Sequence, residues 1–142
     1  MPSPGLVGRI SRFKVAISRL KSIRSMGRER YFSDPFVMDS TERNFQVAIE
    51  AVLDVGSFIV ARKGGPVPSK YREIGPLLVD MGVLDRADGE IVSSLAGLRN
   101  ILVHSYSEVD HEILLSLLDR VEELEHVMSE MLGYMERERI DP

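Results

Sequence analysis

Apolar residues recur at steps of three and four along most of this chain, and this spacing constrains the fold more than any other feature. The longest run lies near the C-terminus, where seven apolar residues alternate steps of three and four: Leu114, Leu117, Val121, Leu124, Met128, Met131 and Met135. Such a seam is typical of helices that pair with a left-handed crossing. It predicts a helix over residues 110–138, whose apolar face belongs either to the chain's own core or to an interface between subunits.

Two earlier segments show the same helical spacing. Residues 7–30 contain five apolar residues at steps of three and four: Ile10, Phe13, Ile17, Leu20 and Ile23. Residues 31–35 break the period because they end in proline, and the residue before a proline avoids the helical conformation. A second helix is expected over residues 40–62, because Asp39 and Glu42 have the spacing of a capping box and a Gly-Gly-Pro sequence follows.

Shorter helices are expected in the middle of the chain. Ser69 can cap a short helix, which Gly75-Pro76 interrupts or kinks before it ends at Met81. A further helix starts at Asp85 or Asp88 and contains Ile91, Leu95, Leu98 and Leu102. No segment of strand length alternates apolar and polar residues. The sequence therefore predicts an all-α fold, an antiparallel bundle of four to five helices in a single domain that spans all 142 residues.

Composition excludes several classes of protein. With 44% hydrophobic and 28% charged residues the chain is typical of a folded globular protein. It contains no cysteine, which excludes disulfides, thiolate zinc sites and cysteine nucleophiles. No stretch approaches the roughly 20 apolar residues of a membrane span, and the first residues lack the pattern of a secretory signal. We therefore expect a cytoplasmic protein that does not associate with membranes.

Charge is distributed unevenly along the chain. Residues 1–30 contain eight Lys and Arg residues and one acid, whereas residues 107–142 contain eleven acids and three Arg residues. One explanation is that two oppositely charged helices lie near one another or face solvent. The other is that the basic segment forms one wall of a phosphate-binding groove. The acidic net charge of −4 does not exclude such a local site.

The strongest local feature is the sequence Leu-Arg-Asn-Ile-Leu-Val-His-Ser-Tyr at residues 98–106. Arg99 offers a planar fork that can bind a phosphate through two hydrogen bonds, and His104 is suited to proton transfer at neutral pH. RNA cleavage without a metal requires these two groups, a base for the 2′-hydroxyl and a cation for the phosphate oxygens. A structural role is the alternative, in which Arg99 pairs with an acid and His104 caps helix carbonyls.

Helical geometry relates these residues to a polar stripe on the second predicted helix. Arg99 and His104 are about 140° apart around a helix and would straddle a cleft, whereas Asn100 and His104 share a face. The stripe consists of Arg43, Gln46, Glu50, Asp54 and Ser57. It is either a solvated edge or a line of groups that faces the Arg99/His104 cleft. In the second case Glu50 or Asp54 would orient the guanidinium of Arg99.

Other motifs that carry chemistry are not found in the sequence. It has no Gly-rich phosphate loop, no His-Glu-x-x-His pair and no serine elbow. Three histidines lack a metal-ligand spacing: His104, His111 and His126. The sequence therefore predicts no metal site and no cofactor.

The spacing Arg99-x4-His104-x-Tyr106 resembles the signature of the HEPN domains. The following Ser-Glu-Val-Asp at residues 107–110 resembles the HepT branch of that superfamily, earlier classified as a domain of unknown function. Three further segments resemble this branch in order and spacing, so the similarity covers roughly residues 1–135: Asn44–Glu50, Tyr71–Ile74 and Met81–Leu84.

This resemblance implies a fold, an activity and partners. HepT-like proteins are homodimeric helical bundles regarded as metal-independent endoribonuclease toxins, usually paired with a small nucleotidyltransferase antitoxin of the MntA type. By this resemblance Arg99 and His104 cleave RNA, and Tyr106 is the residue to which the antitoxin attaches AMP. Two other functions remain open: a non-catalytic HEPN-type partner of a nucleotidyltransferase, and a helical dimerisation module.

Overall fold

The computed structural model describes residues 4–104 and 109–142. These residues form six α-helices and one short 3₁₀-helix and contain no strand, which confirms the expected all-α fold. In chain order the elements are α1 (Pro4–Ser33), α2 (Pro35–Arg62), η1 (Tyr71–Glu73), α3 (Ile74–Asp80), α4 (Arg86–His104), α5 (His111–Leu118) and α6 (Val121–Arg137).

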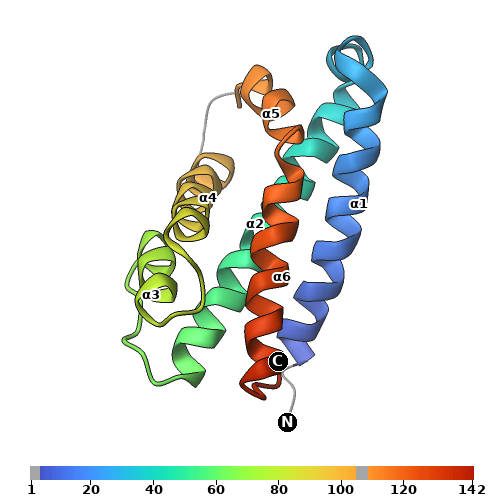
Figure 1. The fold of residues 1–142 in the computed structure, drawn as a ribbon. Helices are drawn as coiled ribbons and strands as arrows, with labels where there is room; N and C mark the ends of the chain where they lie inside the picture. Colours follow the sequence, from blue (N-terminus) through green and yellow to red (C-terminus); the bar gives the residue numbers. More distant parts are fainter. Residues whose placement is uncertain (1–3, 105–108) are drawn as a thin grey trace.

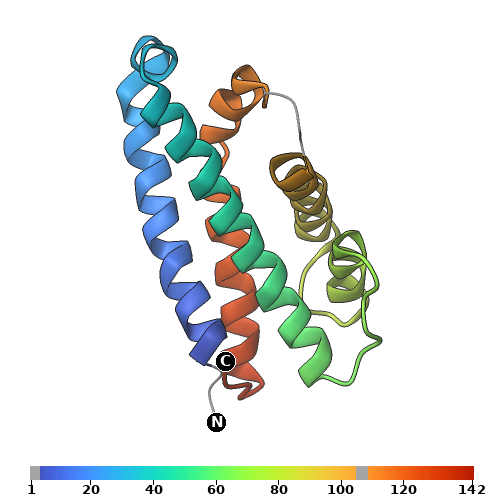
Figure 2. The same ribbon diagram turned by 180° about the vertical axis from the view of Figure 1, so that it is seen from behind.

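Helices α1, α2 and α6 form the body of the bundle (Figure 1). Helices α1 and α2 run antiparallel, and α6 packs beside them so that its end lies next to the start of α1 (Figures 1 and 2). Helices α3 and α4 pack against the other side of α2, and α5 caps the end of the bundle where α1 turns into α2 (Figure 1). Helix α2 is therefore central, with neighbours on both sides.

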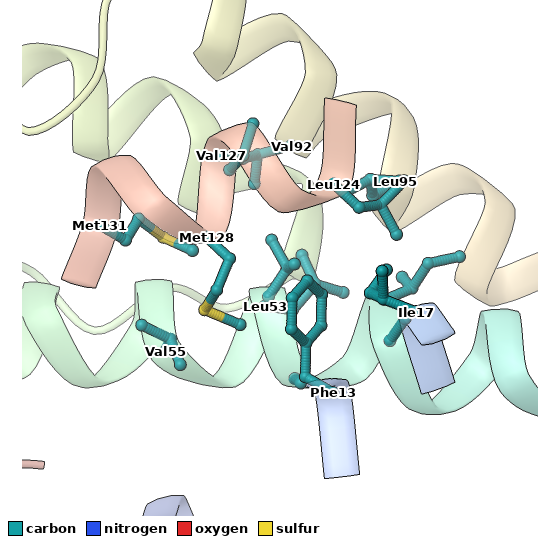
Figure 3. Packing of buried hydrophobic residues seen from close by; sticks show 14 of the residues in the cluster. Phe13, Ile17, Leu53, Val55, Val92, Leu95, Leu124, Val127, Met128 and Met131 are labelled. Carbon is teal, nitrogen blue, oxygen red and sulfur yellow. The ribbon is translucent and has the colours of Figure 1, made fainter. Parts of the chain in front are cut away.

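The core lies between α1, α2, α4 and α6. Figure 3 shows Phe13 of α1 pointing toward Leu53 of α2, with Met128 of α6 beside them. The predicted seam belongs to this core, because six of its seven residues are buried within the chain and Leu117 is partly buried. The structure thus assigns the seam to intramolecular packing rather than to an interface between subunits.

Contrary to the expectation that no stretch approaches a membrane span, helix α2 is long and apolar enough to cross a membrane by length and composition alone. Its apolar window is 61% buried inside the bundle. Such burial is typical of the central helix of a helical core, where apolar residues surround the axis on most sides. The hydropathy of α2 is thus explained by its position between α1 and α4.

The boundary between the first two helices differs from the prediction. Helix α1 continues to Ser33, although Gly27 interrupts it with a φ of +85°, which glycine adopts without strain. Helix α2 begins at Pro35 rather than near residue 40. Asp34 caps it, since its carboxylate accepts a hydrogen bond of 2.9 Å from the Phe36 N–H. Proline at the first helical position gives up no hydrogen bond, and this signal outweighs the capping box expected at Asp39.

The expected C-terminal helix is divided in two at Asp119 and Arg120, which separate α5 from α6. Arg24 of α1 reaches this break, where its Nη1 donates to the Leu118 carbonyl at 3.3 Å and to Glu122 at 2.7 Å. A tertiary contact thus satisfies a carbonyl that the interrupted helix leaves without its own partner. The apolar seam continues across the break, so its spacing gave no sign of the division.

Two smaller expectations are resolved in the middle of the chain. Gly75 and Pro76 do not interrupt α3 but lie in its first turn, and the division falls before Ile74. Helix α4 is capped by Asp85, whose carboxylate accepts a 2.8 Å hydrogen bond from the Asp88 N–H.

The uneven charge is explained in part by packing between helices. Lys21 of α1 pairs with Glu125 at 2.7 Å. Farther along α1, Arg24 pairs with Glu122 and Arg28 pairs with Glu112. The C-terminal half of α1 therefore faces the acidic helices α5 and α6, as the first explanation of the charge pattern predicted.

Candidate active site

Arg99 is held between two elements that are distant from it in sequence. Its Nε lies 3.5 Å from the Glu50 Oε1 of α2, and its Cζ lies 4.7 Å from the centre of the Tyr71 ring in η1. The Arg99 side chain is only 20% exposed. A carboxylate at the edge and an aromatic face beneath together restrict both the position and the plane of the guanidinium.

The part of the chain that the structure describes leaves one nitrogen of this guanidinium without a hydrogen bond. Of the buried side-chain nitrogen and oxygen atoms in the described residues, only the Arg99 Nε has no hydrogen-bond partner. Its contact with Glu50 is long for a hydrogen bond and acts mainly through charge. Buried donors without partners are rare, and functional sites are one place where they persist.

His104 and Asn100 lie on the more exposed side of α4. His104 is the last residue of the helix, and both side chains are exposed to solvent. Arg99 faces α2 and η1, so Arg99 and His104 point in different directions from the end of one helix, as their spacing implies. Tyr106 lies outside the described residues.

The two carboxylates of the polar stripe on α2 face arginines of two different helices, α4 and α1. Gln46 is 3.5 Å from the Glu50 carboxylate, which in turn faces Arg99. One turn further along, Asp54 pairs with Arg9 of α1 at 3.0 Å. The structure thus brings Glu50 next to Arg99 and places Asp54 against α1. Glu50 and Asp54 are therefore more than a solvated edge of α2, because both carboxylates are only partly exposed and each lies close to an arginine.

Burial, more than any other factor, raises the pKa of Asp54. The negative charge of Glu50 acts in the same direction, whereas Arg9 and Arg99 oppose it. Two carboxylates one turn apart on α2 therefore interact with each other as well as with their arginines.

The other two histidines have structural partners. The Tyr31 hydroxyl lies 2.6 Å from Nδ1 of His111, and Nε2 of the same ring lies 3.2 Å from Glu42. His126 of α6 lies 3.1 Å from the Asp88 carboxylate of α4. Among the described residues, no group of three or more His, Cys, Asp and Glu side chains is arranged to hold a metal ion.

Sequence reasoning missed two residues of this site. Tyr71 appeared only as part of a resembling segment, and Arg9 only as one charge among many. Both act through contacts between distant segments, with Arg99 and Asp54 respectively. Helical spacing relates residues within one helix, so it held no signal for these pairs.

An apolar groove of about 600 Å³ lies between α4 and the junction of α5 and α6. Helix α4 contributes Leu98 and Ile101 to it, on either side of Arg99 in sequence, and Ile101 is 55% exposed. Arg72, Arg120 and Glu123 also line the groove. This face of α4 therefore presents apolar surface directly beside the site.

Comparisons with known proteins agree with the resemblance seen in the motif. A family model described as "Ribonuclease HepT-like" matches residues 13–131. A putative RNase from Archaeoglobus fulgidus is 30% identical over 113 residues, which cover 76% of this chain and 80% of the relative. An mRNA nuclease HepT from Shewanella oneidensis is 25% identical over 113 residues, covering 80% of this chain and 84% of the relative.

Solved structures share the fold. A tri-AMPylated Shewanella oneidensis HEPN toxin, in complex with its MNT antitoxin, superposes with a TM-score of 0.81 at 23% identity, covering 92% of this chain and 98% of the other. YutE of Bacillus subtilis, a cytosolic protein of unknown function, gives a TM-score of 0.79 at 21% identity, covering 97% and 93%. The sequence matches go further than the fold and show that this chain belongs to the HepT-like family of ribonucleases.

Proposed function

We propose that this protein is a metal-independent endoribonuclease, the toxin of a toxin-antitoxin pair, and that Arg99 and His104 carry out the cleavage. The observation that carries this proposal is the restrained guanidinium of Arg99, whose buried Nε has no hydrogen-bond partner among the described residues, while an exposed histidine is the last residue of α4. A scaffold or dimerisation module has no need of such an arrangement. The Shewanella relative described as an mRNA nuclease supports the substrate class.

The reaction follows from the chemistry of the two side chains. The His104 imidazole accepts the proton of the 2′-hydroxyl, and the resulting oxygen attacks the adjacent phosphorus. A bond from O2′ to phosphorus forms as the bond from phosphorus to O5′ breaks. The leaving O5′ takes up a proton from solvent, and the His104 imidazolium returns its own proton to solvent, so the protons balance. Arg99 stabilises the negative charge that grows on the phosphate oxygens. The products are a 2′,3′-cyclic phosphate and a 5′-hydroxyl, with no metal ion in any step.

Three residues support this chemistry in the proposal. Glu50 acts on Arg99 as a positioning residue, because its carboxylate is 3.5 Å from the guanidinium. Asp54 acts one turn further along the same stripe and holds Arg9. Asn100 lies four residues before His104, a spacing that allows its amide to orient the imidazole.

The test is cleavage of a mixed RNA in EDTA by the wild type, Arg99→Ala, His104→Ala and Arg86→Ala. Arg86 is an exposed arginine at the start of the same helix and serves as a matched control. Losing a group that acts in the transition state is expected to cost on the order of 10²-fold or more, with binding and circular dichroism largely unchanged. Equal activity in all four proteins, or activity abolished by chelation, would contradict the mechanism.

We further propose a homodimer in which both subunits line the catalytic cleft. The apolar groove beside α4, with Ile101 exposed at its edge, supports this arrangement, and the buried seam of α6 has no part in it. Light scattering after gel filtration is expected to give twice the 16.0 kDa of one chain. A single protomer at micromolar concentration would argue against the dimer.

The proposed partner is an MntA-like nucleotidyltransferase that attaches AMP to the Tyr106 hydroxyl. The structural neighbour described as a tri-AMPylated toxin with its antitoxin supports this pairing. The added phosphate carries negative charge and would compete with RNA for the guanidinium of Arg99. Intact-mass spectra are expected to show additions of ~329 Da per AMP on wild type and none on Tyr106→Phe. Modification of the Phe variant would show that another residue is the acceptor.

A further inference from the structure

A small pocket of about 80 Å³ between α1 and α2 is lined by three arginines, Arg9, Arg12 and Arg43. The rest of its lining comes from α2: Val47, Glu50, Ala51 and Asp54. Arg9 is already paired with Asp54 at 3.0 Å. The pocket is too small for a base or a nucleoside, and guanidinium groups are suited to binding an oxyanion.

The charges around this pocket are unbalanced in favour of cations. Among residues 4–104 and 109–142, no carboxylate lies within 4.0 Å of Arg12 or Arg43, and both side chains are exposed. The C-terminal half of α1 behaves differently, since Lys21, Arg24 and Arg28 each face an acid of α5 or α6. Packing between helices thus neutralises one half of α1 and leaves the half at the pocket positive.

The pocket is next to Arg99 through two carboxylates that it shares with the site. Glu50 lines the pocket and lies 3.5 Å from Arg99, whereas Asp54, one turn away, binds Arg9. The four-residue step from Glu50 to Asp54 corresponds to about 6 Å along α2. Because Glu50 both lines the pocket and contacts Arg99, the pocket arginines and Arg99 are separated by a single carboxylate side chain of α2.

From this placement we infer that Arg9, Arg12 and Arg43 form a second phosphate subsite, which binds the RNA backbone beside the phosphate held at Arg99. The inference rests on the proposed function, since it assigns a binding surface to the same substrate. The strand crosses the stripe of α2, with one phosphate at Arg99 and a flanking phosphate at Arg12 and Arg43. Arg9 completes the subsite and is kept in place by Asp54.

The first test is binding of a fluorescent single-stranded oligoribonucleotide to His104→Ala protein, measured by anisotropy at several salt concentrations. Adding Arg12→Ala or Arg43→Ala is expected to weaken binding and to flatten the plot of log K against log salt by about 0.7 for each phosphate that the variant no longer neutralises. Lys14→Ala is the matched control, because Lys14 lies about 200° from Arg12 around α1 and its removal takes away an equal charge. Arg9 is left unchanged because its removal would leave the Asp54 carboxylate without the cation that pairs with it.

The second test uses the catalytically active protein and substrates of two lengths. Arg12→Ala and Arg43→Ala are expected to raise KM for a long strand, with kcat nearly unchanged. Cleavage of a dinucleotide with a single phosphodiester should be unaffected, since it has no flanking phosphate for the subsite.

The outcomes separate the two proposals. If RNA binds and is cleaved but Arg12→Ala and Arg43→Ala behave like Lys14→Ala, the second subsite is refuted and the ribonuclease stands. If the variants affect the dinucleotide as much as the long strand, the arginines act at the scissile phosphate and the inference is also wrong. If the wild type neither binds nor cleaves RNA, both proposals fail together.

Discussion

The guanidinium of Arg99 depends on a residue that no helical spacing could identify. Tyr71 lies beneath it with 4.7 Å between Cζ and the ring centre, and the ring is the part that makes this contact. Tyr71→Phe is therefore expected to keep nearly full ribonuclease activity. Tyr71→Ala removes a cation–π interaction of about 1 kcal/mol, which corresponds to roughly a fivefold loss of kcat/KM. If Phe lowers activity as much as Ala, the hydroxyl rather than the ring supports Arg99.

Tyr31 is a second residue whose setting leads to a measurable prediction. It is fully buried with its hydroxyl 2.6 Å from His111. Burial, with a smaller contribution from the Glu42 charge, raises the pKa of Tyr31 from 10.0 to about 12, against the opposing effect of the Thr41 hydroxyl. The folded protein thus holds this proton more tightly than the unfolded chain, which stabilises the fold below about pH 10.

The stability from Tyr31 is therefore expected to be lost as the pH rises from 10.0 toward 12, by on the order of 2–3 kcal/mol. Tyr31→Phe should be less stable at neutral pH, by about 1 kcal/mol for the missing hydrogen bond, and should lose less stability above pH 10. Denaturant unfolding followed by circular dichroism at pH 8 to 11 measures both effects. Parallel pH profiles for the two proteins would show that Tyr31 titrates normally.

At the scale of elements, α3 and α4 approach each other through glycine. A Cβ added at Gly75 would lie 2.4 Å from the Gly89 carbonyl oxygen and 2.7 Å from Ser93 Oγ, and backbone cannot move aside as a flexible side chain can. Gly75→Ala is therefore expected to destabilise the protein by roughly 1–3 kcal/mol or more. Gly8→Ala in α1 meets open space and should leave stability unchanged or raise it by up to about 1 kcal/mol. Thermal unfolding of the two variants compares these effects, and equal Tm values would rule out the close approach.

The elements themselves were predictable where the signal is local. The apolar period identified the course of α1, α2, α4 and α6, and Gly64 ended α2 in a left-handed conformation, as the Gly-Gly-Pro sequence indicated. The start of α2 was wrong because two local signals competed, and proline after Asp34 outweighed the later capping box. The break between α5 and α6 could not be read from the spacing. It is accompanied by the contact of Arg24 with Leu118, which joins residues 94 positions apart.

At the scale of the whole molecule, the same limit applies to the site. The helical wheel placed Glu50 and Asp54 on one stripe, but only the packing of three elements shows that Glu50 meets Arg99 while Asp54 meets Arg9. The charge pattern of the sequence was limited in the same way. It predicted that opposite charges lie close together, yet which cations of α1 are neutralised depends on where α5 and α6 pack.

The ion pairs between α1 and the acidic helices α5 and α6 make the stability of the fold depend on pH in the acidic range. Hydrogen bonds from Arg24 lower the pKa of Glu122 from 4.5 to about 2, and those from Arg28 lower the pKa of Glu112. A carboxylate with a lowered pKa in the folded state stabilises the fold above its unfolded value. This contribution is complete above about pH 4.5 and is lost as the pH falls toward 2.

Glu122→Gln is therefore expected to lower Tm at neutral pH and to make the further fall in Tm below pH 4.5 shallower than in the wild type. Both differences should shrink at high salt, because these pairs are exposed and solvent ions screen them. Glu130→Gln removes an equal charge from an exposed position of the same helix and should retain the wild-type acid profile. Thermal unfolding by circular dichroism between pH 2 and 7 gives the comparison. If Glu122→Gln and Glu130→Gln have the same profile, the pair of Arg24 with Glu122 does not set the acid stability of the fold.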